Sequence, residues 1–133
     1  MKKMSWVIGL MTALVITSLY SVAVQSGEVH RVIETREDAI DAALDFILNN
    51  HEGLSGLQIP STWVNEGLVY EDIVGYSVVQ FTSGDWAAEV GNAVVQEPVY
   101  DVEVEFTGEL SFVWKGTVDR SGNVVETEFV MEN

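Results

Sequence analysis

A strict alternation of apolar and polar residues over residues 99–130 constrains this chain more than any other feature. Apolar side chains recur there at every second position in three successive runs, and the last two are separated by a turn at residues 120–123. Successive side chains of a β-strand point to opposite faces, so each run predicts a strand with one apolar and one polar face. The pattern therefore predicts an antiparallel sheet with one side on a hydrophobic core and the other in water.

Two further strands are expected before this block, over residues 76–82 and 85–95. The segment that joins them contains Ser and Gly, a composition typical of a hairpin turn. Residues 51–75 are interrupted by Gly and Pro, and we expect mostly loop there, with a short strand near residues 67–70. The sequence thus predicts a sheet of about five strands.

One helix is expected in the body of the chain, over Arg36–Asn50. Thr35 is a favourable N-cap, and Asp38 at the third helical position completes a capping box. The apolar residues of this segment fall on one helical stripe, namely Ala39, Ile40, Ala43, Leu44 and Ile47. The predicted fold class is α+β, with this helix packed on the apolar side of a curved antiparallel sheet.

Residues 1–24 are interpreted as a targeting segment. Lys2 and Lys3 precede an uncharged, mainly apolar run over residues 5–24. Small residues at Ser21 and Ala23 suit a signal-peptide cleavage site, whereas the length of the run also suits a retained membrane anchor helix. Both alternatives place the remainder outside the cytoplasm, because the lysines stay on the cytoplasmic side. Residues 25–34 would be a linker, and residues 35–133 a single domain that is secreted or tethered by residues 5–24.

The charge balance narrows the classes of partner. The chain has 21 Asp and Glu residues against 6 Lys and Arg residues, a net charge of -15. An acidic surface repels phosphates and anionic lipid headgroups, so nucleic acid is not an expected partner, and membrane contact is expected only through residues 5–24. The acidity fits an ordinary solvated surface, adaptation to salt, or cation binding. The absence of Cys excludes disulfides and thiolate chemistry.

Signatures of catalysis are few. The sequence has no G-x-S-x-G motif, no Gly-rich phosphate-binding motif and no calcium-binding loop motif. His30 and His51 are the only histidines, and they lack the spacing of zinc ligands. We therefore expect no catalytic residue, no metal site and no cofactor. The sequence leaves one enzyme class open, a hydrolase that uses a glycosidase-like pair of carboxylates, because Asp101, Glu103 and Glu105 share one strand face. The alternation, however, predicts that this face is solvated.

Binding is the remaining route to a function. The edge of an open sheet can accept an extra strand from a partner. Trp86 and Trp114 would anchor such a contact if they point outward, although burial is the commoner fate of aromatic residues in alternating strands. Asp101, Glu103 and Glu105 complete the set of candidate binding residues.

The helix and the final hairpin resemble the PepSY class, which are small extracytoplasmic modules of protease propeptides and of secreted or membrane-tethered proteins. The segment VDRSGNVV at residues 118–125 is similar to the V-D-x-x-G-x-V hairpin of that class. The block TSGDW at residues 82–86 is also similar to uncharacterised secreted prokaryotic proteins. The resemblance implies a cystatin-like arrangement of helix and sheet, and binding or inhibition of a partner.

The leading expectation is a non-enzymatic extracytoplasmic binding or regulatory module whose partner is a protein or an envelope component. One alternative is a carboxylate-dependent hydrolase of the cell surface. A second alternative is a cation-binding surface protein.

Overall fold

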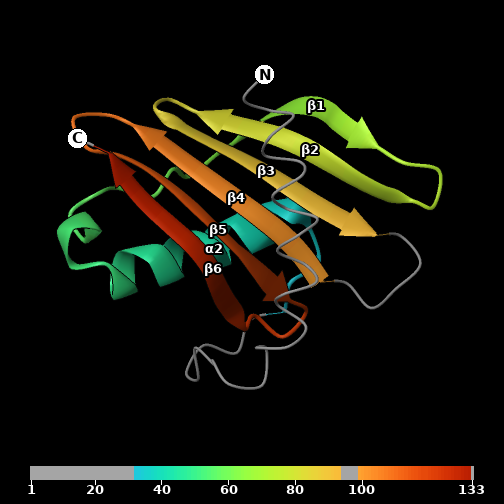
Figure 1. Ribbon diagram of the computed structural model, residues 1–133, viewed down its shortest axis with the longest axis horizontal. Helices are drawn as coiled ribbons and strands as arrows, with labels where there is room; N and C mark the ends of the chain where they lie inside the picture. The colour runs from blue at the N-terminus through green and yellow to red at the C-terminus, as the bar shows by residue number, and fades with distance from the viewer. Residues whose placement is uncertain (1–31, 94–98, 133) are drawn as a thin grey trace.

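A single α-helix lies across one face of a six-stranded antiparallel sheet in the computed structural model, which describes residues 32–93 and 99–132 (Figure 1). The elements in chain order are α2 (Arg36–Asn50), the short 3₁₀ helix η1 (Glu52–Leu54), β1 (Val64–Glu71), β2 (Tyr76–Ser83), β3 (Trp86–Ala93), β4 (Val99–Thr107), β5 (Ser111–Asp119) and β6 (Val124–Glu132). Each strand pairs with the next along the chain, so the sheet order is β1-β2-β3-β4-β5-β6. The predicted α+β class, with one helix on an antiparallel sheet, is confirmed for these residues.

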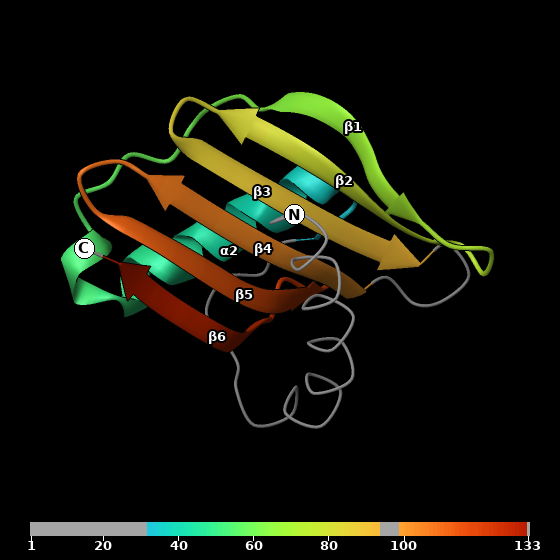
Figure 2. The same ribbon diagram turned by 45° about the horizontal axis from the view of Figure 1, so that its top comes forward.

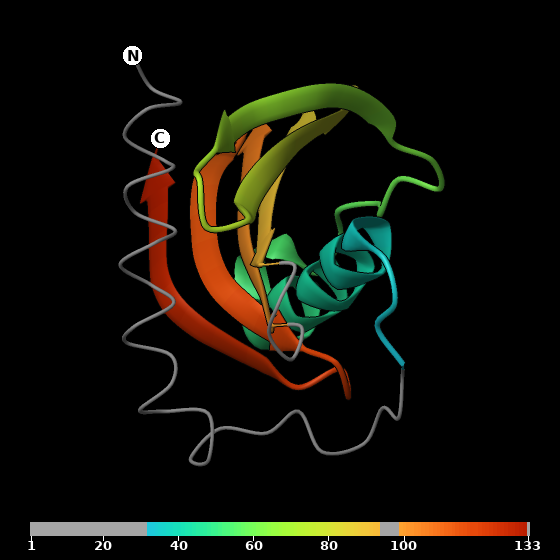
Figure 3. The same ribbon diagram turned by 90° about the vertical axis from the view of Figure 1, so that its right-hand side faces the viewer.

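The sheet curls around α2, so it has a concave face toward the helix and a convex face away from it (Figures 2 and 3). The helix contacts β3, β4, β5 and β6. Its buried residues Ile40, Leu44 and Ile47 belong to the same core as buried residues of β3, β4 and β5, including Val90, Val102 and Trp114. The apolar face predicted from the alternation is therefore the concave face.

The ends of α2 are those that the sequence predicts. The Thr35 side chain accepts a 3.0 Å hydrogen bond from the Asp38 backbone N–H, and the Asp38 carboxylate accepts one of 3.2 Å from the Thr35 N–H. This reciprocal capping box satisfies donors that have no partner within the helix. The helix ends at Asn50, and the N–H of its C-cap, His51, donates to the Ile47 carbonyl.

The sheet has one strand more than the five expected, because the short strand expected near residues 67–70 is part of an eight-residue strand, β1, within the segment predicted to be mostly loop. Sequence alternation fails there for a physical reason: β1 is at the edge of the sheet and its side chains are largely exposed. Its register with β2 shifts twice, and Gly67 adopts a φ of 100°. An edge strand of this kind has no buried face to select alternating apolar residues.

The predicted targeting segment at residues 1–24 and most of the predicted linker lie outside the described residues. Among residues 32–93 and 99–132, no helix has both the length and the apolar character needed to span a membrane.

Candidate functional site

Both tryptophans predicted as binding candidates point into the core. Trp114 is fully buried, and its Nε1 donates a 2.8 Å hydrogen bond to Oε1 of Glu126. Trp86 is also buried, with its ring 4.7 Å from that of Phe106 between centroids. The condition for an anchoring role, an outward-pointing ring, is therefore not met by either residue.

The three acidic candidates share the convex face, but two of them are not solvated as expected. Asp101 and Glu103 have no exposed surface, and Glu105 is half-buried. Oη of Tyr76 donates a 2.8 Å hydrogen bond to Oδ2 of Asp101, whereas Oδ1 of Asp101 is buried and has no hydrogen-bond partner among the described residues. The alternation thus predicts the correct face for these carboxylates. Its prediction that they are solvated is wrong for Asp101 and Glu103, which are buried.

Burial changes the acidity of both carboxyl groups. Loss of hydration raises the pKa of Asp101 to about 7, against the opposing effect of the Tyr76 hydrogen bond. Loss of hydration also raises the pKa of Glu103 to about 8, and the ammonium of Lys115 opposes this rise. Glu103 is therefore mainly a neutral carboxylic acid at pH 7. Raised pKa values occur in catalytic sites and in structural networks alike, so geometry has to decide between them.

Charged side chains of the neighbouring strands surround Glu103 on the convex face. Glu103 is paired in register with Glu89 on β3 and with Lys115 on β5, all on the convex face. Nζ of Lys115 in turn lies 3.6 Å from Oε1 of Glu128 on β6. Neither Asp101 nor Glu103 lines either of the two hollows described below. Neither of these two hollows, which are lined by described residues, therefore holds Asp101 and Glu103 as the pair of facing acids that a glycosidase-like site requires.

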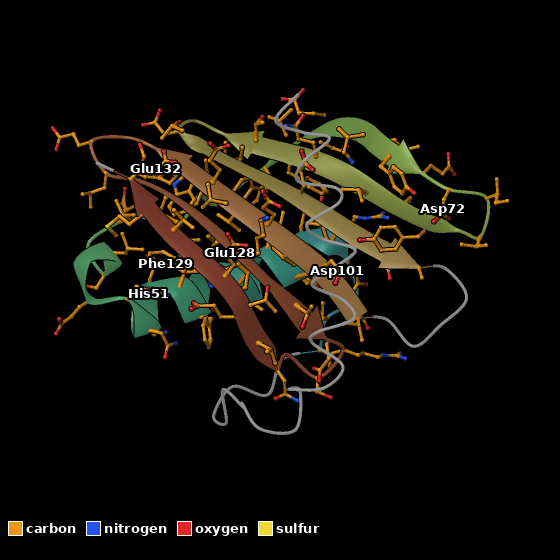
Figure 4. The ribbon with its side chains drawn as sticks, viewed as in Figure 1. His51, Asp72, Asp101, Glu128, Phe129 and Glu132 are labelled. Atoms are coloured by element: carbon orange, nitrogen blue, oxygen red, sulfur yellow. The ribbon has the colours of Figure 1, made fainter. Side chains whose placement is uncertain are left out.

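A histidine–carboxylate pair that sequence reasoning missed joins the end of α2 to β6. Nε2 of His51 lies 2.6 Å from Oε1 of Glu126, the same oxygen that accepts from Trp114. The His51 ring also stacks on Phe129, with 3.9 Å between centroids (Figure 4). Within the described part of the chain, no Ser or Thr hydroxyl is hydrogen-bonded to His51. The evident role of the pair is to fix the helix end against β6.

Strand β6 forms one edge of the sheet, because within the described residues its outer side pairs with no strand. The last five residues of β6, from Glu128 to Glu132, pair with β5 in unbroken register. The single register shift between the two strands comes before them, opposite Lys115 and Gly116 of β5. Val130 and Met131 are exposed by 42% and 40% of their surface. The opposite edge, β1, is interrupted by two register shifts, so β6 is the more regular of the two edges.

Two hollows accompany this framework. One, of about 260 Å³, lies beside the first turn of α2 and is lined by residues of that turn and of β1 to β4. The other, of about 590 Å³, lies between the loop at residues 57–61 and the β2–β3 turn, with Trp86 and Phe106 among its lining residues. Of the five predicted candidates, Trp86 alone lines one of these two hollows, although only 6% of its surface is exposed.

No three His, Asp or Glu side chains within residues 32–93 and 99–132 are placed to hold a metal ion together. Comparison of the chain with protein families, with curated proteins and with solved structures finds no match.

Proposed function

We propose that this protein is a non-enzymatic binding module that accepts an extended segment of a partner protein along the outer edge of β6. The observation that carries this proposal is the regular, partly apolar edge from Glu128 to Glu132. An edge strand presents unpaired backbone N–H and C=O groups, and an added strand satisfies them with main-chain hydrogen bonds. The irregular β1 edge is much less suited to this pairing.

The two faces of β6 define the chemistry of the partner segment. Glu128 and Glu132 share the convex face, because they pair in register with Lys115 and Ser111. Phe129 and Met131 share the concave face, because they pair with Trp114 and Phe112. Directly opposed side chains on neighbouring strands contribute about 0.2–1 kcal/mol each when they are matched. The matching segment therefore alternates basic residues, on the convex side with Glu128, Val130 and Glu132, with apolar residues, facing Phe129 and Met131.

The overall charge supports the same class of partner. With a net charge of -15, the protein attracts basic segments over distances of about one Debye length, roughly 8 Å at physiological salt. We place the module outside the cytoplasm, secreted or tethered by residues 5–24, as the leader-like sequence predicts. The proposed PepSY-like relationship is consistent with a binding role of this kind.

A direct test uses a capped nine-residue peptide that alternates Lys and Val, titrated into the protein at physiological salt. We expect saturable binding, and we expect the double variant Glu128→Lys/Glu132→Lys to weaken it by about tenfold or more, through lost and reversed cross-strand pairs. The matched control is Glu66→Lys/Glu71→Lys, which makes the same charge change at exposed positions of the other edge, β1.

The control variant should retain most of the affinity. Equal losses in both double variants would show attraction by net charge alone and would remove the proposed site. A peptide of the same composition with its Lys and Val residues in two blocks should bind more weakly, since only an alternating segment places all its basic residues on the glutamate side.

A further inference from the structure

Strand β6 is interrupted at Thr127 by one extra residue. Gly116 of β5 pairs with Glu126, whereas the preceding residue, Lys115, pairs with Glu128, so Thr127 has no partner on β5. Oγ1 of Thr127 donates a hydrogen bond of 3.1 Å to the Lys115 carbonyl. Two residues of one strand that face a single residue of its neighbour form a β-bulge, which bends the strand and disrupts the ladder locally. The bulge therefore divides β6 into a segment before Thr127 and a segment after it.

The bulge sends two glutamates that lie two positions apart to opposite faces of the sheet. In a regular strand, such residues share a face. Glu126 instead lies on the concave side, where its Oε1 accepts a hydrogen bond from Nε1 of Trp114 and lies 2.6 Å from Nε2 of His51. Glu128 lies on the convex side, opposite Lys115. The segment before the bulge is thus fixed to the core and to α2, whereas the segment after it forms the proposed partner edge.

β5 accommodates the bulge through Gly116. A Cβ atom at this position would collide with the Trp114 ring and with the backbone carbonyl oxygen of Val125. The Trp114 ring and the backbone of β6 therefore occupy the space that a side chain would fill. Together with the hydrogen bond of Thr127, this close packing fixes the position of the bulge along the strand.

We infer that the bulge at Thr127 ends the partner site, so that a bound segment pairs with residues 128–132 and not with residues 124–126. An added strand needs outward-facing N–H and C=O groups at regular intervals, and a bulge breaks these intervals and turns the edge away. This role of Thr127 rests on the proposed function of the β6 edge, and it sets the length and the register of the partner segment.

The test compares two capped nine-residue peptides of equal charge, Lys-Val-Lys-Val-Lys-Val-Lys-Val-Lys and Lys-Val-Lys-Val-Lys-Pro-Lys-Pro-Lys. An antiparallel partner places its first five residues opposite residues 128–132 and its last four toward Val124. Because Pro has no N–H and is excluded from the interior of a sheet, the second peptide cannot extend the pairing. With the full wild-type chain, we expect similar affinities for the two peptides, with amide exchange slowed at residues 128–132 and unchanged at residues 124–126.

The decisive variant lacks Thr127. Its removal restores one-to-one pairing between β5 and β6, and every other residue of β6 keeps its partner and its face. The regular edge then extends through residues 124–126, so this variant should bind the first peptide about tenfold more tightly than the second, with exchange also slowed at these residues. Thr127→Val is the matched control, because it removes the hydroxyl but retains the extra residue, and it should bind both peptides as the wild type does.

The role of the bulge is overturned if the wild type binds the first peptide about tenfold more tightly than the second, with exchange slowed at residues 124–126, or if the variant that lacks Thr127 folds and shows no preference. In either case, the proposed edge site would stand. Binding only to the variant that lacks Thr127 would reject the proposed function and support the role of the bulge, whereas failure of both peptides to bind either chain would remove both. If the variant does not fold, the comparison of the two peptides on the wild type decides.

Discussion

The hydroxyl of Tyr76, at the start of β2, donates a 2.8 Å hydrogen bond to Oδ2 of Asp101 on β4, across the intervening strand β3. The contact is possible because β3 carries Gly91 at the crossing point, where a Cβ atom would collide with the Tyr76 hydroxyl. Gly91 is paired in register with Val78 on one side and with Asp101 on the other. Three residues from three neighbouring strands thus form one unit on the convex face.

Replacing Gly91 with Ala should therefore destabilise the fold. The added methyl group displaces the Tyr76 ring and breaks its hydrogen bond to Asp101, and overpacking of this kind costs about 1–3 kcal/mol. Urea denaturation measures the loss in the free energy of unfolding. Gly53→Ala is the control, since a Cβ there has no atom within 4 Å, and its effect should stay within about 0.5 kcal/mol. Equal midpoints for the two variants would contradict the described packing.

Stability should also decline as the pH rises. Burial raises the pKa of Asp101 from 3.8 to about 7 and that of Glu103 from 4.5 to about 8. Between the pKa values of the unfolded and the folded state, the folded state binds more protons than the unfolded state. The contribution of both carboxyl groups to the free energy of unfolding is therefore complete below about pH 4 and is lost as the pH rises to about 8. Urea midpoints recorded across this interval measure the decline.

The variant Glu103→Gln isolates one of the two groups, because its amide mimics the neutral acid at every pH. The urea midpoint of Glu103→Gln should fall less than that of the wild type as the pH rises from 4.5 to about 8. The control Glu109→Gln removes the same formal charge at an exposed position in the β4–β5 turn and should leave the wild-type decline unchanged. Identical pH profiles for Glu103→Gln and the wild type would show that Glu103 is hydrated.

The Glu126 carboxylate should matter more for stability than its neighbour Glu128. Glu126→Ala leaves the buried Trp114 indole N–H and His51 without their shared acceptor, at a cost of about 1–3 kcal/mol. Glu128→Ala removes only the ion pair in which Oε1 of Glu128 lies 3.6 Å from Nζ of Lys115. The Glu128 side chain is 53% exposed, and an ion pair open to water on one side is worth about 0–1 kcal/mol. Urea denaturation followed by Trp fluorescence compares the stability of the two variants. A larger loss of stability in Glu128→Ala would contradict the role of Glu126 as the shared acceptor.

Local signals in the sequence predict much of this fold. The capping box at Thr35 and Asp38 spans four residues, and the alternation within β4 and β5 depends on each strand alone, so helix limits and strand faces are predictable. A short strand is expected within β1, near residues 67–70, but the bounds of β1 are not predictable, because an exposed edge selects no alternation.

The candidate site is less predictable, because its contacts join residues that are distant in sequence. Asp101 is buried by Tyr76, 25 positions away, and His51 meets Glu126 over 75 positions. Single-strand patterns assign a face to a carboxylate, but they do not indicate which side chain from another strand covers it.

The proposed edge binding is tested most directly by amide hydrogen exchange, measured residue by residue with and without the alternating Lys–Val peptide. An added strand pairs with every second residue of an edge. We therefore expect slowed exchange at alternate amides of β6 between Glu128 and Glu132, and unchanged exchange in β1. Protection confined to β1, or no change in β6 at saturating peptide, would contradict it.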